Sequence, residues 1–306
     1  MGKLSRSTRF SIKGINKTWL IVGACVFFTF IFAVILGNIL GDKAASSQNS
    51  GGGAGGISSI TSPSTDKVSP RSKLHAYFAD MTGADPNSSL SDQTGTARSK
   101  GNALCISLRD ASGNLIYSSS TANELGYPSR SNLTLDRLNN HFDYYADYAV
   151  AYFKSDFSAG LGTDKRIEIQ ANELRILHEA TVSAFDQIVI DFSGEINRYN
   201  VIYYQAYILE LKLACPDTSV GVRLTQTFLS GSSNTGAIAD LLSVADFYAI
   251  DLGSSSASEI ASVLDPLTYF AERYNGVAII AQGDEATLEE RISALEKKGI
   301  TSYIVK

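Results

Sequence analysis

Several acidic residues stand directly after short apolar runs of this sequence. The segment FDQIVIDFSGE, Phe185 to Glu195, joins an apolar strand to Asp191, and the second acid, Glu195, follows four residues later. Asp251 ends a comparable run near residue 250. Two carboxyl groups that face one cleft can divide acid and base chemistry, because one donates a proton while the other accepts one or attacks. We therefore predict catalytic roles for Asp191, Glu195 and Asp251.

Four further residues lie near predicted strand ends and are candidates for substrate binding. They are Asp110, Asp156, Tyr199 and Gln282. The alternative for each carboxylate is that it braces a turn or caps a helix. Asp80 and Asp284 also follow predicted strands, and Asp284 is interpreted as the N-cap of the last long helix.

The elements that must position these residues alternate between strands and helices. Apolar runs bounded by turn residues predict eight strands, and crossovers of helical length join them. The strands are expected at 75–79, 103–108, 148–153, 187–191, 219–224, 247–252, 276–281 and 302–305. Stripes at three- and four-residue spacing predict helices through 135–145, 202–213, 260–270 and 288–295, whereas 84–101 is polar and reads as a loop with a short helix. After the second strand, 115–117 predicts a hairpin or excursion.

Eight parallel strands with helical crossovers predict an α/β fold, a (β/α)8 TIM-like barrel, over residues 74–306. The alternative is an open doubly wound sheet. In either fold, functional residues lie just beyond the carboxyl ends of the strands. The predicted strand ends therefore place Asp191 where a functional residue is expected.

The residues before the barrel predict a membrane anchor and a tether. Trp19–Leu40 is almost wholly apolar, and five basic residues precede it within a short tail at 1–18. About 20 apolar residues suffice to cross a bilayer, and the positive-inside rule places the N-terminus in the cytoplasm and the barrel outside. A cleaved signal peptide is the alternative. Residues 41–73 are rich in Gly, Ser and Thr, which predicts a flexible, disordered linker.

The net charge and the cysteines limit which classes of partner and cofactor the chain is expected to bind. All 31 acidic residues but only 21 of the 26 basic residues follow residue 41, so this part has a net charge of −10. No basic patch of the nucleic-acid-binding type is visible, and we predict no nucleic-acid partner. Cys105 and Cys215 are expected to be buried thiols. The three histidines are scattered, so we predict no metal site and no cofactor.

Three stretches in register resemble the glycoside-hydrolase barrel domain of bacterial exported and membrane-anchored proteins. They are NALCISLRDASGNLIYS from Asn102, YAVAYFKSDF from Tyr148 and FDQIVIDF from Phe185, which resemble the second, third and fourth strands of that family. The resemblance covers most of 74–306 and implies a (β/α)8 barrel that hydrolyses polysaccharide through paired carboxylates.

The sequence departs from the family pattern at positions expected to line the cleft. Ser107 stands where the pattern has Asp, and Ser193-Gly194-Glu195-Ile196 replaces Val-Arg-Phe-Pro. Ile250–Gly253 replaces a Met-x-Tyr-Pro motif. The resemblance therefore implies a divergent member, anchored in the cell membrane, that acts on or binds polysaccharide of the cell envelope. Two alternatives stand beside it: an inactive barrel that serves as a carbohydrate- or protein-binding module, and a doubly wound solute receptor.

Overall fold

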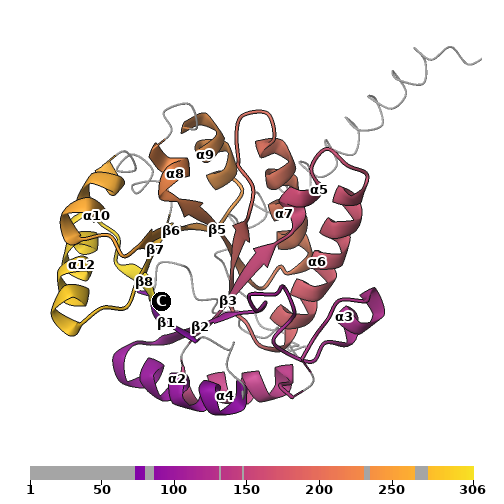
Figure 1. Cartoon of the computed structure of the whole chain (residues 1–306), viewed down its shortest axis with the longest axis horizontal. Coiled ribbons are helices and arrows are strands. Elements are labelled where there is room, and N and C mark those ends of the chain that lie inside the picture. Colours follow the sequence, from indigo (N-terminus) through magenta and orange to yellow (C-terminus); the bar gives the residue numbers. More distant parts are fainter. Residues whose placement is uncertain (1–72, 80–85, 131, 147, 231–234, 266–274) are drawn as a thin grey trace, which may run out of the picture. The chain divides into compact units, whose positions relative to one another are not determined.

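The computed structural model describes residues 73–79, 86–130, 132–146, 148–230, 235–265 and 275–306. Strands and helices alternate along this part of the chain (Figure 1). The strands are β1 (His75–Ala79), β2 (Ala103–Ser107), β3 (Tyr148–Ser155), β4 (Gln187–Phe192), β5 (Ser219–Thr225), β6 (Phe247–Gly253), β7 (Asn275–Ile280) and β8 (Ser302–Val305). The helices are α2 (Pro86–Lys100), α3 (Ser120–Leu125), α4 (Leu135–Tyr145), α5 (Phe157–Gly160), α6 (Lys165–Ser183), α7 (Val201–Ala214), α8 (Gln226–Ser230), α9 (Thr235–Leu242), α10 (Ala257–Leu264) and α12 (Glu285–Lys297).

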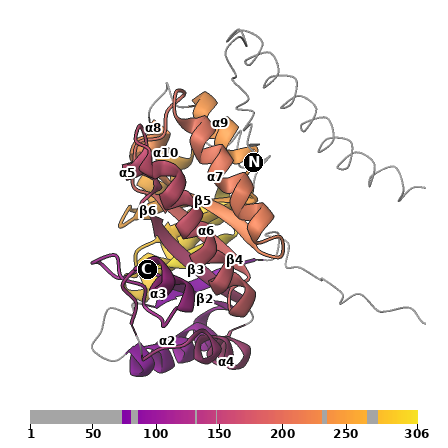
Figure 2. The same ribbon diagram turned by 90° about the vertical axis from the view of Figure 1, so that its right-hand side faces the viewer.

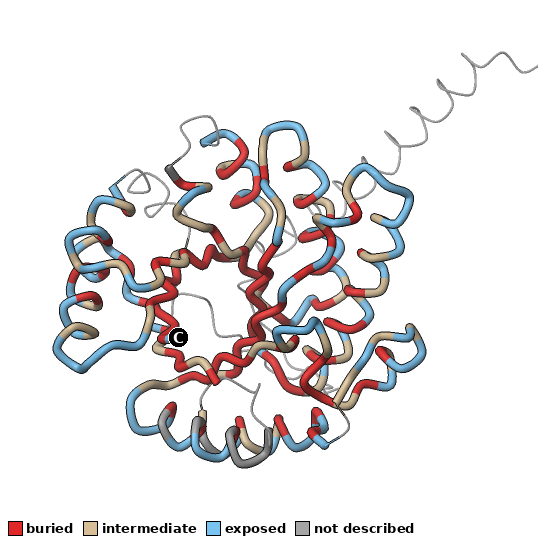
Figure 3. Tube along the Cα trace, viewed as in Figure 1, coloured by how far each residue is buried: buried red, intermediate tan, exposed pale blue. Residues whose placement is uncertain are grey.

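The eight strands close into a parallel barrel in sequence order, as expected. Each strand pairs with the next one, and β8 returns to β1 with Tyr77 opposite Val305. This last pairing removes both sheet edges, so the open doubly wound sheet is wrong. The helices lie outside the ring of strands, which is buried on both faces (Figures 1 and 3).

Alternation along each strand separates the barrel interior from the layer beneath the helices. The interior is filled mainly by small and branched side chains, together with the rings of Phe247 and Tyr152. Gly221 on β5 provides the space for that ring, because a Cβ at this position would lie 2.2 Å from the Phe247 ring. The same alternation directs Tyr152, Asp191 and Arg223 inward at the carboxyl ends of β3, β4 and β5.

The prediction of a loop with a short helix across 84–101 is wrong, because α2 is a helix of 15 residues. Leu90, Thr94 and Ala97 are buried at helical spacing. The hydroxyl of Thr94 donates to the Leu90 carbonyl at 2.9 Å, so this polar side chain is satisfied inside the helix. The buried stripe was missed because two of its three members are small or polar.

Several smaller expectations are confirmed. Cys105 and Cys215 are buried free thiols. The Asp284 side chain accepts a hydrogen bond from the Thr287 amide at 2.8 Å and caps α12. The run after β2 forms an antiparallel bridge between Arg109 and Leu115. The end of the stripe predicted at 260–270 lies outside the described residues beyond position 265.

The predicted tail, anchor and linker, residues 1–18, 19–40 and most of 41–73, lie outside the described residues, as does Asp80. Within the part of the chain that the structure does describe, no helix combines the length and the apolar character needed to cross a bilayer.

Candidate active site

One arginine joins the carboxylates of two strands at the barrel mouth. Arg223 Nη1 donates to Asp191 Oδ1 at 2.9 Å, and Nη2 lies 2.5 Å from Asp251 Oδ2. On the other side, the hydroxyl of Tyr152 donates to Asp191 Oδ2 at 2.6 Å. Both oxygens of Asp191 are therefore held in place from the neighbouring strands β3 and β5.

Burial and charge fix the protonation of these donors. Burial raises the pKa of Tyr152 and the charge of Asp191 raises it further, so the phenol keeps its proton. Burial lowers the pKa of Arg223, but interactions with Tyr152, Asp191 and Asp251 outweigh this effect and raise it. The site therefore presents a permanent cation between two carboxylates.

A cavity of about 630 Å³ opens at this position. Its wall contains Tyr152, Lys154, Asp191, Phe192, Ser193, Gly194, Glu195, Ile196, Arg223, Thr225, Thr227, Phe228 and Lys306. Glu195 is exposed, and its carboxyl group has no hydrogen bond or ion pair with any residue that the structure describes. The cavity therefore combines an oriented carboxylate, Asp191, with an unpaired one, Glu195, and has the size of a small-molecule or oligomer site.

The structure brings together all three residues predicted as catalytic. Asp191 and Glu195 line the cavity, and Asp251 is bound to Arg223 at its edge. Because one guanidinium contacts both aspartates, their carboxyl groups fall within the ~10 Å that paired-carboxylate hydrolysis spans.

The residues predicted to bind substrate lie elsewhere. Asp110 braces its own loop, with hydrogen bonds from the amides of Ser112 at 2.9 Å and Asn114 at 3.0 Å. Asp156 pairs with Arg109 at 2.6 Å. Gln282 lines a different hollow beside Tyr77 and Lys100.

Tyr199 is exposed and does not line the cavity, and the guanidinium of Arg198 lies 4.5 Å from the centre of its ring. Its ring is thus accessible from solvent on one face. Of the four residues predicted to bind substrate, Tyr199 is the one nearest in sequence to the cavity wall at Glu195.

Several residues of the cavity wall were missed from sequence, among them Tyr152, Lys154, Arg223 and Lys306. The amine of Lys306 lies 5.6 Å from the centre of the Tyr152 ring and 5.2 Å from that of Phe78. Arg223 could have been identified from sequence as a candidate site residue, because it is a charged residue inside an otherwise apolar strand, SVGVRL. A charge at an inward position near a strand end requires a partner, and that partner is the pair of aspartates.

A second, buried network holds the end of β3 from outside the barrel. Glu173 on α6 is fully buried and accepts hydrogen bonds from Ser155 Oγ at 2.6 Å, the Asp156 amide at 2.7 Å and the Tyr207 hydroxyl at 2.9 Å. Arg109 lies 3.4 Å from Glu173 and donates to the Lys154 carbonyl at 3.0 Å. Burial raises the pKa of Glu173 despite these contacts. The network fixes the strand that carries Tyr152 and Lys154.

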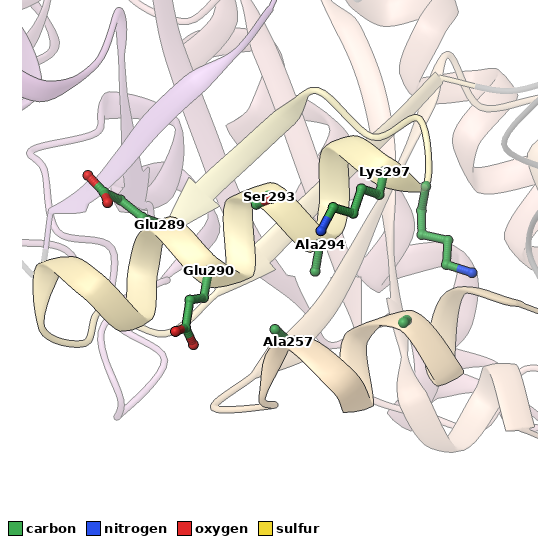
Figure 4. A pocket seen from close by; sticks show the side chains of 8 residues that line it. Ala257, Glu289, Glu290, Ser293, Ala294 and Lys297 are labelled. Carbon is green, nitrogen blue, oxygen red and sulfur yellow. The ribbon is translucent and has the colours of Figure 1, made fainter.

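A separate groove of about 530 Å³ lies between α10 and α12 (Figure 4). Small side chains, among them Ala257 and Ala294, form part of its wall, and Glu290 and Lys297 flank it. None of the predicted site residues lines it. Among the described residues, no cluster of three or more His, Cys, Asp or Glu side chains is placed to hold a metal ion.

The fold matches solved glycoside hydrolases at low sequence identity. A fucosidase-like protein from Bacteroides thetaiotaomicron gives a TM-score of 0.57 at 13% identity, over 81% of this chain and 90% of that one. The endo-1,4-β-mannanase of Rhizomucor miehei gives 0.53 at 12%, over 76% and 85%. The spore cortex-lytic enzyme SleL of Bacillus cereus gives 0.50 at 11%, over 76% and 70%. Identities this low show the fold alone.

No family model matches the sequence, and no curated protein matches it. The chain is thus a (β/α)8 barrel, and the fold by itself does not give its activity.

Proposed function

We propose that this barrel binds a carbohydrate polymer in the mouth cavity and hydrolyses it with Asp191 and Glu195. The observation that supports this most is the pairing of an oriented carboxylate with an unpaired one on the same cavity wall. Glycoside hydrolysis needs one carboxylate that attacks or activates water and one carboxylic acid that protonates the leaving oxygen.

Asp191 is the nucleophile or base in this proposal. Tyr152 and Arg223 hold its two oxygens at 2.6 and 2.9 Å, which fixes the orientation of the carboxyl group in the cavity wall. Glu195 is the acid, since it is free of ion pairs with the described residues and lies on the connection between β4 and α7. Asp251 positions Arg223 and does not itself touch the substrate.

The other side chains of the cavity suit a polymer of sugars. Lys154, Ser193, Thr225 and Thr227 offer hydrogen-bond donors along its wall, and Phe228 offers an apolar face. Tyr199, which is exposed and follows Glu195 by four residues, is the platform on which the next sugar of the chain would stack.

A non-catalytic binding module is the second candidate, and one observation favours it. Arg223 bonds to both aspartates, so the cleft places a cation where a pair of free carboxylates would otherwise stand. In that case the cavity retains sugar binding through its polar wall without hydrolysis. This would be a barrel that keeps the fold of a hydrolase and uses it for recognition.

We further propose that Trp19–Leu40 anchors the chain in the cell membrane with residues 1–18 in the cytoplasm and the barrel outside. The substrate would then be a polysaccharide of the cell envelope, within reach of a tether of about 30 residues. Protease treatment of intact cells tests the topology, because an exterior barrel is digested and an interior one is protected.

Hydrolysis and binding of isolated envelope polysaccharide by the detergent-purified full chain test the function. We expect Asp191→Asn and Glu195→Gln each to lower the release of reducing ends by about 10²–10⁴-fold while sedimentation with the polymer persists. If the wild-type chain binds the polysaccharide but releases no reducing ends, the barrel is a non-catalytic binding module. Neither binding nor release, across the envelope polysaccharides, would reject both functions.

A further inference from the structure

Helix α7 carries apolar side chains on both of its faces. Its inner face packs against the barrel through Val201, Tyr204, Ile208 and Leu211, all buried. Its outer face carries Ile202, Leu209 and Leu213, whose exposed fractions are 62%, 48% and 81%. A helix that is apolar all round is normally covered on all sides, so the outer face requires a partner. In Figure 2, α7 lies on the outside of the barrel between α6 and α9.

The outer residues form a narrow seam with regular spacing. Ile202, Ala206, Leu209 and Leu213 are separated by four, three and four residues, which is the a/d pattern of helices that pack against another helix. We call these four residues the outer seam. Polar residues at 205, 210 and 212 flank it, so the apolar stripe is only wide enough to contact a single partner helix.

The spacing of the outer seam is symmetric about the midpoint of α7. If a second α7 lies antiparallel across it, Ile202 of one copy faces Leu213 of the other, and Ala206 faces Leu209. The same operation brings the end that carries Arg198 towards the end that carries Asp217, which are opposite charges. A two-fold interface has this self-complementary form.

We propose that the outer seam of α7 is the interface of a homodimer in which the two α7 helices pack antiparallel. Stable interfaces bury roughly 800 Å² on each partner. The outer seam is continued at the amino end of α7 by the exposed side chain of Tyr203, and an aromatic side chain buries about 150–250 Å² when it is fully covered. The apolar residues on and beside the outer seam thus supply a large part of the required area.

A lipid surface fits the outer seam less well. Membrane-binding helices combine a broad apolar face with Lys and Arg on the polar face. The single lysine of α7, Lys212, is paired with Asp246 at 2.5 Å, and the exposed Glu210 would meet the anionic head groups. Packing against a second α7 helix explains why the apolar residues of the outer seam form a narrow stripe with two-fold symmetric spacing. Binding to a lipid surface would not require this spacing.

Sedimentation of the full chain in a non-ionic detergent tests the dimer. We expect a dimer at micromolar concentration, and Leu213→Glu should raise the dissociation constant at least tenfold. Leu213 is the most exposed residue of the outer seam, so its replacement leaves the monomer folded, which the thermal midpoint checks. Val182→Glu is the matched control, because Val182 is 73% exposed on α6 and lines a hollow on the α4 side, away from the outer seam.

A monomeric wild-type chain, or a dimer that Leu213→Glu leaves intact, would overturn the proposal. Flotation of a monomeric chain with phosphatidylserine vesicles, lost in Leu213→Glu, would assign the outer seam to lipid instead. Ile202→Glu repeats the test at the other end of the helix.

Cross-linking tests the antiparallel orientation. In a Cys25→Ser background, a chain with Ile202→Cys mixed with a chain with Leu213→Cys should form a mixed disulfide, and neither variant should link to itself. Self-linking of both variants would show parallel packing and contradict the inferred symmetry. The background chain without an added cysteine is the control.

Discussion

Arg223 donates twice to one oxygen of Asp251, from Nε at 3.1 Å and from Nη2 at 2.5 Å, and this leaves Nη1 free to reach Asp191. Asp251 thus sets the direction of the guanidinium. We expect Asp251→Asn to lower kcat on the proposed polysaccharide substrate by roughly tenfold to a hundredfold, because small displacements at a reacting centre have effects of this size. Initial-rate kinetics measures it.

The control for this change is Asp265→Asn, which alters an exposed aspartate that caps the end of α10, is paired with Lys298 and does not line the cavity. It should leave kcat unchanged. If Asp251→Asn equals Asp191→Asn in its loss of rate, Asp251 would be acting on the substrate itself and the positioning role would be wrong.

Removal of the Tyr152 hydroxyl isolates a single hydrogen bond. Tyr152→Phe keeps the ring against Phe78 but deletes the 2.6 Å bond to Asp191, and hydrogen bonds to charged groups are worth about 1.5–3 kcal/mol. We expect urea denaturation to show a loss of this size. Tyr199→Phe, at an exposed position, should change the free energy of unfolding by less than about 0.5 kcal/mol. Equal effects of the two variants would mean that the Tyr152 hydroxyl bond contributes nothing.

The buried carboxyl of Glu173 predicts a pH dependence of stability. Burial raises its pKa in the folded state above the ordinary value of 4.5, so the folded chain binds this proton to higher pH than the unfolded chain does. The stability contributed by the group is therefore present below pH 4.5 and is lost as the pH rises through the folded pKa. Denaturation curves from pH 4 upward should show this decline in the wild type and a flatter profile in Glu173→Gln. Parallel profiles would contradict it.

Two glycines give opposite expectations. Gly221→Ala places a methyl group 2.2 Å from the Phe247 ring inside the barrel and should cost about 1–3 kcal/mol, since overpacking displaces the core. Gly95→Ala, on exposed α2 with nothing within 4 Å of the new methyl, should stabilise by about 0.4–1 kcal/mol. Thermal denaturation of both variants checks the packing of β5 against β6.

The two barrel cysteines should be inert in the folded chain. Burial raises the pKa of the Cys105 thiol and of the Cys215 thiol, and both side chains are shielded from solvent. Alkylation at pH 8 followed by peptide mass mapping should find both unmodified until denaturant is added. Modification of Cys105 in the folded chain would show that the barrel interior opens.

The strands were predictable because each is a short apolar run, and runs such as Gln187–Phe192 are buried on both faces. Helix α2 was not, because its buried stripe uses Thr94 and Ala97, whose apolar surface is too small to stand out. Closure of the barrel followed from the number of strands and from the βα alternation. The pairing of β8 with β1 is a tertiary contact, and the sequence predicted it only indirectly, through the expected barrel.

For the site, position at a strand end identified Asp191 and Asp251 but did not give the direction of each side chain. Asp110 and Asp156 also stand beside strand ends, yet they fold back onto their own loop or onto Arg109. Tyr152 and Arg223 were missed because they lie within strands. A tyrosine in a strand is usually interpreted as a core residue, and a single arginine as an exception to the apolar pattern. The stagger between neighbouring strands decides which inward-pointing residues meet at the barrel mouth. This stagger is fixed only when the barrel closes.

The last pairing of the barrel also governs when the domain can form. Leu74 binds Ser302 across 228 positions of sequence, so the strand that completes the ring is the last of the eight to be synthesised. Until β8 arrives, β1 and β7 each present an unpaired edge that can capture other chains. Parallel closure over such a distance is slow. The mouth cavity, whose wall includes Lys306, can therefore be complete only after the last strand has been made and paired.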